Sequence, residues 1–287
     1  MRYGTPGALR DALEHRLRIR SETTGIGLDR LRRRVVFERV VARLQAAEPD
    51  RWVLKGGMAL EVRLRDQARL TKDIDLGLRD QAGDGPELHA RLVEALTPDP
   101  FGDDFVILAK TPRRLIGDGP DSLVWRASVD ANLAGRLFGR LSLDIAPRGS
   151  ELDATQRVQL PNSLAFAGIE SPTIEIIDVQ RHAAEKFHGM QRDFGIRDNS
   201  RVRDLVDLVI LHENDLIDPP RLSAAVRNVW REREQTEPPA TLPAFPESWP
   251  DRYEQLATDH DLQTRAFPAA VTLVTDLWVA LFTTEEH

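Results

Sequence analysis

The spacing of apolar residues predicts helices at both ends of the chain. Apolar residues recur at helical spacing between residues 28 and 47, and a shorter helix is predicted before them, over residues 5–20. From Asp178 onwards the pattern is again helical, with helices predicted near residues 178–194, 201–213, 220–235 and 264–283. The stretch 237–250 contains five prolines, which predicts a linker or an ordered wrap between helices.

The middle of the chain favours short strands separated by turns and short helices. A strand-sized apolar run at residues 52–54 leads into Lys55-Gly56-Gly57, and helices are predicted over residues 58–65 and 86–96. Between Arg140 and Ile145, apolar and polar residues alternate, so Ser142 and Asp144 share the polar face of a predicted strand. The strands predicted in this region cover residues 74–78, 105–109, 122–133 and 140–146.

This order of elements predicts an α+β protein with a mixed sheet, N-terminal helices and a helical C-terminal portion. The chain has 287 residues, which is enough for one large mixed unit or two smaller domains. We expect an α/β domain with N-terminal helices over residues 1–170 and a helical domain over residues 171–287.

Composition excludes several classes of protein and of site. The chain contains no cysteine, so disulfides, thiolate catalysis and cysteine metal sites are excluded. No apolar run approaches the roughly 18 residues that a membrane span needs. The N-terminal residues are charged throughout and lack the apolar core of a signal peptide. We therefore expect a cytoplasmic protein without a membrane partner.

The distribution of charge argues against a protein that coats nucleic acid unselectively, because the net charge is -7. Residues 8–45 nevertheless contain ten arginines and five acidic residues. This basic region, which includes Arg32, Arg33 and Arg34, favours an anionic macromolecule as the acceptor of a reaction. A solvated helix face is the alternative interpretation of the same arginines.

The densest group of chemically useful residues lies between Lys55 and Leu78. A strand that ends at Gly56 and Gly57 before a helix leaves backbone N–H groups free to bind a phosphate. Further on, Asp73 and Asp75 alternate on a predicted strand, so their carboxylates share one face and repel each other unless a cation lies between them. Oxygen ligands of this kind suit Mg²⁺ (or Mn²⁺), and Asp144 is a candidate third carboxylate ligand.

Two pairs of segments together resemble a known family. The segment KGGMALEVR, residues 55–63, is followed by RLTKDIDL, residues 69–76. A second pair of segments, AEKFHG at residues 184–189 and RVRDLVDL at residues 201–208, follows in the same order. This combination resembles the AbiEii/AbiGii toxin family of nucleotidyltransferases over about residues 50–212. Met58 departs from the pattern, since the family usually has threonine or serine there, and we expect altered nucleotide affinity rather than lost activity.

The resemblance implies a nucleotidyltransferase-type palm and a role for each matching residue. Asp73, Asp75, Lys186 and Asp207 would be catalytic. Metal binding would fall to Asp73, Asp75 and Asp144, and nucleotide binding to Lys55, Gly56, Gly57, Thr71 and Lys186. Asp207 would help to organise Lys186, whereas Asp204 is expected to be structural.

The resemblance also implies a reaction and its partners. The enzyme would transfer a nucleoside monophosphate from an NTP to RNA, most simply to the 3′ acceptor end of tRNA, and would block translation as the toxin of a toxin–antitoxin system. Its partners would then be an NTP, tRNA and a cognate antitoxin protein.

Two alternatives remain open: nucleotidylation of a small molecule or a protein, and a non-catalytic module that binds RNA or protein. The intact Asp73, Asp75 and Lys186 count against the non-catalytic module. An isolated lysine on a helix is usually solvated, and this is the alternative interpretation of Lys186. The alternative for Asp204 and Asp207 is an ion pair with Arg201 or Arg203 on the same helix. The chain contains no zinc-binding histidine pattern, and we interpret His188 as a packed residue.

Overall fold

The computed structural model describes residues 3–65, 68, 71, 73–116, 123–147, 149–191, 199 and 201–283. The chain divides into two compact units. The first unit comprises Met1–Val62 and Thr71–Ile176, and the second comprises Arg63–Leu70 and Ile177–His287. Each unit is described by itself below.

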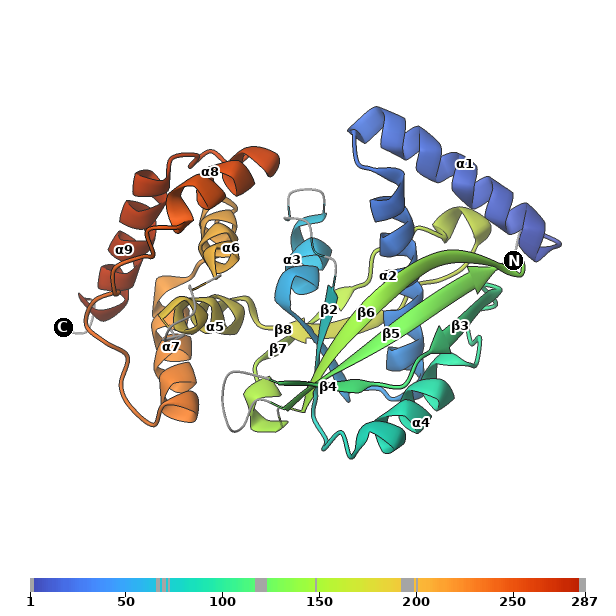
Figure 1. The fold of residues 1–287 in the computed structure, drawn as a ribbon, viewed down its shortest axis with the longest axis horizontal. Helices are drawn as coiled ribbons and strands as arrows, with labels where there is room; N and C mark the ends of the chain where they lie inside the picture. The colour runs from blue at the N-terminus through green and yellow to red at the C-terminus, as the bar shows by residue number, and fades with distance from the viewer. Residues whose placement is uncertain are drawn as a thin grey trace. The chain divides into compact units, whose positions relative to one another are not determined.

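The first unit combines helices with one mixed sheet (Figure 1). Its helices are α1 (Pro6–Thr24), α2 (Leu28–Ala47), most of α3 (Gly56–Leu64) and α4 (Gly85–Leu96), with short 3₁₀ helices at Gly149–Leu152 and Ala165–Ala167. Its strands are β1 (Trp52–Lys55), β2 (Asp73–Leu78), β3 (Phe105–Ala109), β4 (Arg113–Ile116), β5 (Leu123–Leu133), β6 (Arg136–Pro147), β7 (Thr155–Gln159) and β8 (Thr173–Ile177).

Local sequence signals set the helix ends in this unit. The helix α1 begins where the hydroxyl of Thr5 accepts a hydrogen bond from the backbone N–H of Ala8, and it ends at Gly25, whose φ of 71° is left-handed. The helix α4 begins with a capping box, in which Asp84 and Glu87 each accept a hydrogen bond from the other's backbone N–H.

Among the described residues, the sheet has eight strands in the order β3-β5-β6-β2-β1-β8-β7, with β4 paired to β5. Strand β2 runs parallel to β6, and β1 runs parallel to β8, while the β1–β2 and β5–β6 pairs are antiparallel. The predicted α+β class with a mixed sheet is therefore confirmed. The strands β4, β7 and β8 were not predicted.

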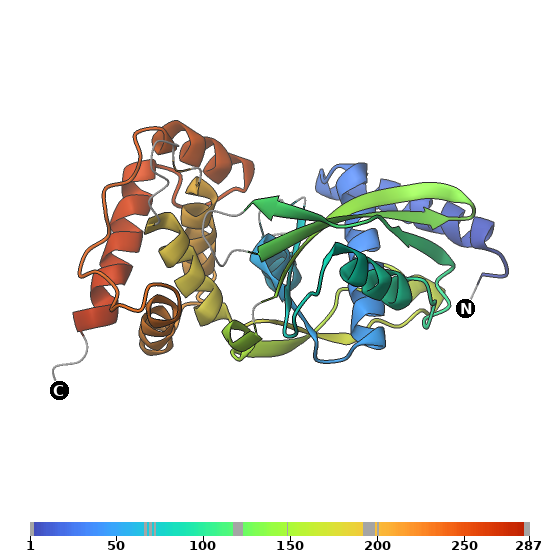
Figure 2. The ribbon, with the colours of Figure 1, turned by 60° about the horizontal axis from the view of Figure 1, so that its bottom comes forward.

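One face of the sheet is apolar and covered by helices. The helix α2 packs on β6, and α4 packs on both α2 and β3, so the two helices lie on the same side of the long β5–β6 hairpin (Figure 2). The apolar side chains of β6 that were predicted to share a face are buried: Leu141, Leu143 and Ile145. The polar residues between them, Ser142 and Asp144, belong to the opposite face and are only half-buried.

Several arginines of the basic region are structural. Arg39 and Arg43 on α2 are fully buried, and Arg43 Nη2 lies 2.7 Å from Asp103 Oδ1 and donates to the Phe105 carbonyl. Arg32 joins α2 to α1 through an ion pair of 2.8 Å with Glu14. Part of the basic region is therefore not available to an anionic acceptor. Charge in a sequence does not reveal that a guanidinium has a buried carboxylate partner.

The second unit is helical. It contains α5 (Val179–Gln191), α6 (Val202–Glu213), α7 (Pro219–Arg233), α8 (Trp249–Asp259) and α9 (Phe267–Thr283), and its core includes the fully buried Trp249, Tyr253 and Trp278. No helix among the described residues is long and apolar enough to cross a membrane.

The proline-rich stretch of this unit is only partly a connection between helices. The indole N–H of Trp278 donates to the Pro239 carbonyl at 3.2 Å, so the stretch is anchored on α9 as an ordered wrap. Its last residues open α8, with Pro250 in the first turn, a position where the missing N–H costs no helical hydrogen bond. The sequence analysis gave no helix between residues 235 and 264, so α8 was missed.

A buried glutamate ties α2 to the connection between β7 and β8. Glu38 is 3% exposed, and its carboxylate accepts hydrogen bonds from the backbone N–H and the hydroxyl of Ser163, at 2.7 and 2.8 Å. Burial raises the pKa of Glu38 to about 7. The hydrogen bonds from Ser163 favour the charged form and lower the pKa, but burial is the larger effect. The folded protein therefore binds a proton at Glu38 more tightly than the unfolded chain does.

We predict a pH-dependent stability difference between the wild type and Glu38→Gln. The stabilisation from the proton on Glu38 is complete below the ordinary glutamate pKa of 4.5 and is lost as the pH rises through about 7. Glutamine does not titrate and keeps a carbonyl oxygen as acceptor. In urea unfolding, the free energy of unfolding of the variant relative to that of wild type should rise by about 2–3 kcal/mol between about pH 5 and about pH 8. Glu22→Gln, at an exposed site, is the control. A stability difference between Glu38→Gln and wild type that does not change with pH contradicts the prediction.

Candidate active site

Four charged residues form a row across four adjacent strands of the first unit. Asp75 on β2 lies opposite Lys55 on β1 and beside Asp144 on β6, and Asp144 lies opposite Arg126 on β5. Residues in register on neighbouring strands point to the same face of a sheet, so these four side chains belong to one face. We call Lys55, Asp75, Asp144 and Arg126 the charged row.

Asp73 joins the same face. It lies two residues before Asp75 on β2, while Ile74 between them is buried on the opposite face. The prediction that Asp73 and Asp75 share a face is thus confirmed by the strand assignment. The side chain of Asp73 is 43% exposed, so one carboxylate of this pair is open to solvent.

Arg126 binds the predicted third carboxylate. Its Nε and Nη2 atoms each lie 2.6 Å from one oxygen of Asp144, a bidentate arrangement, and Nη2 lies 3.7 Å from Asp73 Oδ2. The hydrogen bond to Asp144 raises the pKa of Arg126 above its ordinary value, and it outweighs the opposing effect of burial. Sequence reasoning missed Arg126, because a bulge at Ala131/Asn132 shifts the hairpin register and brings Arg126 opposite Asp144.

The two glycines lie where the chain turns from β1 into α3. Gly56 has a φ of 58°, and a Cβ atom placed on it would overlap the carboxylate of Asp75. Gly57 is buried in the first turn of α3. Glycine at position 56 therefore serves two needs, a left-handed backbone and the close approach of Asp75 to the helix N-terminus.

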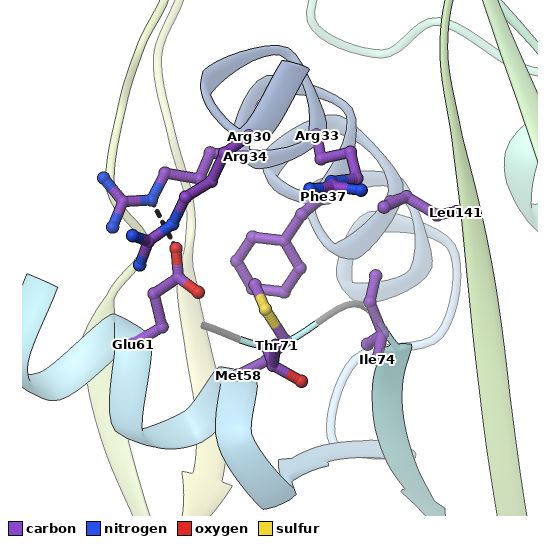
Figure 3. A pocket seen from close by; sticks show the side chains of 9 residues that line it. All are labelled: Arg30, Arg33, Arg34, Phe37, Met58, Glu61, Thr71, Ile74 and Leu141. Atoms are coloured by element: carbon purple, nitrogen blue, oxygen red, sulfur yellow. Dashed lines mark hydrogen bonds and ion pairs between the residues drawn. The ribbon is translucent and has the colours of Figure 1, made fainter. Parts of the chain in front are cut away.

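Thr71 and Met58 line a pocket under α2 (Figure 3). The other residues that line it are Arg30, Arg33, Arg34, Phe37, Glu61, Ile74 and Leu141. Because Ile74 and Leu141 belong to the helix-covered face, this pocket lies on the side of β2 opposite to Asp73 and Asp75. The hydroxyl of Thr71 donates to the carbonyl of Asp73 at 3.3 Å, and Met58 extends toward Phe37 (Figure 3).

Lys186 in the second unit is buried between two carboxylates. Its Nζ lies 2.7 Å from Asp204 Oδ1 and 2.8 Å from Asp207 Oδ2. The second oxygen of Asp204 lies 2.6 Å from Arg201 Nε, and a Cβ on Gly189 would overlap the Arg201 guanidinium. We call Lys186, Asp204, Asp207 and Arg201 the lysine cluster. The interpretation of Lys186 as a solvated surface lysine is therefore wrong. The ion pair between Arg201 and Asp204, which the sequence also allowed, is present.

Two histidines of α5 lie near this cluster in the sequence. His182 is one turn before Lys186 and fully buried, and its ring nitrogens have no hydrogen-bond partner in the described part of the chain. Burial, followed by the charge of Lys186, lowers the pKa of His182 to about 3, so the imidazole is neutral. His188 packs edge-on against Trp230, with Nε2 at 2.8 Å from Glu234.

The donor set on β2 fits a divalent cation. Two carboxylates on one face, with Asp73 half-exposed, offer the oxygen ligands that Mg²⁺ prefers. Within the described ranges, no three histidine or acidic side chains converge on a single metal position. A cation at Asp73 and Asp75 would therefore take its remaining ligands from water or from the oxygens of a phosphate.

The family described as "Nucleotidyl transferase AbiEii toxin, Type IV TA system" matches residues 39–274, which is most of the chain. The chain belongs to this family. The resemblance recognised in the two pairs of sequence segments is thus confirmed, and so is the class of enzyme: the protein is a nucleotidyltransferase of a toxin family. A comparison with curated proteins gave no significant match.

Solved structures that are similar to this chain include a nucleotidyltransferase toxin. The AbiEii-family chain is similar to MenT4, a nucleotidyltransferase toxin from Mycobacterium tuberculosis H37Rv, with a TM-score of 0.60 and 21% identity over 95% of this chain and 90% of that one. A possible nucleotidyltransferase from H. pylori matches with a TM-score of 0.41 and 17% identity over 89% and 91% of the two chains. The Megavirus polyadenylate synthase matches with a TM-score of 0.36 and 12% identity over 80% and 41%.

We predict that Gly56→Ala abolishes most of the activity of this AbiEii-family enzyme. A methyl group at a left-handed position costs about 1–2 kcal/mol, and here it also displaces the carboxylate of Asp75. The rate of nucleotidyl transfer should fall by at least ~100-fold, while circular dichroism still reports a folded protein. Gly27→Ala is the control, since nothing lies within 4 Å of its added Cβ. A Gly56→Ala enzyme within about twofold of wild type would refute the role of the turn.

We predict separate effects on stability and activity for Lys186. Lys186→Met leaves Asp204 and Asp207 buried without their ammonium partner, which should destabilise the fold by about 3–5 kcal/mol. The triple variant with Asp204→Asn and Asp207→Asn removes this repulsion and should recover stability in denaturant unfolding, yet remain at least ~100-fold less active. Lys186→Arg should not restore full activity, because a planar guanidinium does not replace a compact ammonium. An active triple variant would mean that Lys186 is structural only.

Proposed function

We propose that this enzyme transfers a nucleoside monophosphate from an NTP to the 3′ acceptor end of tRNA and thereby blocks translation. The observation that carries the proposal is the pair of carboxylates, Asp73 and Asp75, on one face of β2 and next to the Gly56 turn. Carboxylates crowded in this way attract a divalent cation, and a nucleotidyltransferase needs one beside its triphosphate.

The proposed reaction is an in-line displacement at the α-phosphorus. The acceptor hydroxyl oxygen forms a bond to phosphorus, the bond to the pyrophosphate leaving group breaks, and the hydroxyl proton passes to solvent. Mg²⁺ (or Mn²⁺), when bound by Asp73 and Asp75, neutralises charge on the phosphate oxygens. Lys55, Gly56 and Gly57 belong to the proposed nucleotide-binding set. Thr71, which was predicted to belong to it, lines the pocket on the other side of β2, so its proposed role is to hold the start of β2 through its hydrogen bond to the Asp73 carbonyl.

Lys186 is the proposed cationic contact to the nucleotide phosphates, and Asp207 is proposed to hold it in place. The 2.8 Å ion pair and the complete burial of Asp207 support this positioning role. Asp204 shares the ammonium at 2.7 Å, so the lysine is restrained from two sides. Because its ammonium group is already held in place, Lys186 loses little side-chain entropy when a phosphate binds. A charge that is fixed in this way stabilises a transition state better than a mobile one does.

A polyanionic acceptor is supported by the arginines that remain at the surface. Arg16 and Arg18 on α1 are exposed, and the Arg16 guanidinium lies 4.4 Å from the ring centroid of Phe166. Surface cations of this kind favour nucleic acid over a small neutral acceptor. Membership of a type IV toxin–antitoxin family supports a cognate antitoxin as the partner of the protein in the cell.

We predict that the purified enzyme labels tRNA when it is incubated with total tRNA, Mg²⁺ and an NTP labelled at the α-phosphate. Asp73→Ala or Asp75→Ala should abolish the label, because each removes a proposed metal ligand. The unfolding midpoint should stay the same or rise, since one of two like charges is gone. Label on the protein, or on an added small molecule, would instead support the alternative acceptors. Full labelling by both variants would refute the carboxylate site.

A further inference from the structure

The charged row contains a cation that is already bound to its carboxylates. Both oxygens of Asp144 accept a hydrogen bond from Arg126 at 2.6 Å, and the same guanidinium lies 3.7 Å from Asp73. Arg126 is therefore in contact with two of the three carboxylates predicted to bind metal. A metal ion on Asp144 would have to break a bidentate, charge-assisted pair and lie next to a like charge.

The fold holds this arginine in place. Arg126 and Asp144 are directly opposite on β5 and β6, and the bulge at Ala131/Asn132 maintains that register. Both side chains are partly buried, at 30% exposed for Arg126 and 16% for Asp144, so solvent screens the pair only in part. A guanidinium keeps its proton at any physiological pH, which makes its charge as permanent as that of a metal ion.

We propose that Arg126 takes the place of a second metal ion: it neutralises Asp144, so the enzyme binds one divalent cation, through Asp73 and Asp75. The inference rests on the proposed function, because it assumes that this face holds the catalytic metal. It assigns Asp144 to the arginine rather than to the metal. Arg126 is then a positioning residue, which orders the carboxylates and limits how many cations they can bind.

The test is a titration of the full-length protein with Mn²⁺, with free Mn²⁺ followed by electron paramagnetic resonance. The wild type should bind one Mn²⁺. Arg126→Gln leaves Asp144 without its cation and should either bind a second Mn²⁺ or bind the first several-fold more tightly. The double variant Arg126→Gln/Asp144→Asn removes the pair without changing the net charge, and it should bind one Mn²⁺ within about twofold of the wild-type affinity.

Two further variants control the experiment. Arg140→Gln/Asp130→Asn removes another cross-strand ion pair of the same hairpin, 3.2 Å between Arg140 Nε and Asp130 Oδ1, and should leave binding unchanged. Asp75→Asn should bind Mn²⁺ with an affinity at least ~10-fold lower than that of wild type. If Asp75→Asn binds normally, the proposed metal site itself is wrong.

Other outcomes would overturn the role of Arg126 alone. The inference is wrong if the wild type binds two Mn²⁺ ions, or if Arg126→Gln binds Mn²⁺ as the wild type does. It is also wrong if the charge-neutral double variant loses more than ~10-fold in affinity, because Asp144 would then be a metal ligand. Thermal unfolding of each variant shows that a lost signal is not a lost fold.

Discussion

Carboxylates fixed side by side on a sheet repel each other, and this repulsion is the constraint that organises the face of the first unit. Asp75 and Asp144 are neighbours in register on β2 and β6, and Asp73 is one pleat away. The strands on either side place a basic residue in the same row, Lys55 on β1 and Arg126 on β5. The order of charges across the sheet is thus positive, negative, negative, positive, which offsets the repulsion at both ends.

In the second unit, charges of opposite sign also lie next to each other, but there they are buried away from solvent. Lys186 lies between Asp204 and Asp207 at hydrogen-bonding distance, and both carboxylates are almost completely buried. Removing three charges from water is costly, and such clusters are rarely the most stable solution for a protein core. The proposed contact of Lys186 with the nucleotide phosphates gives this cluster a functional reason.

Features of the backbone, rather than the side chains alone, fix the positions of these charges. Gly56 allows the backbone to approach the Asp75 carboxylate, and Gly189 leaves room for Arg201 against α5. The bulge in the β5–β6 hairpin sets which arginine meets Asp144. Asp75 and Arg126 are thereby placed on strands, and Arg201 at the N-cap of α6, which reduces the reorganisation that a reaction would require.

The sequence by itself determined the local pattern. Helical and alternating periodicity predicted α2, α5, α6 and the apolar face of β6, because a side chain's direction within one element depends only on its position in that element. The same rule placed Asp73 and Asp75 on one face. The two motifs in order identified the family over about residues 50–212, which lie within the matched residues 39–274.

Only the tertiary structure decided which charges meet. Without the bulge, continuing the turn register of the hairpin would bring Arg126 opposite Leu143, and a shift of one residue turns every following side chain to the other face. The burial of Lys186 depends on α6 packing beside α5, and the burial of Arg39 and Arg43 depends on Asp103, some sixty residues away. These partners are distant in sequence, and periodicity carries no information about what covers a given face.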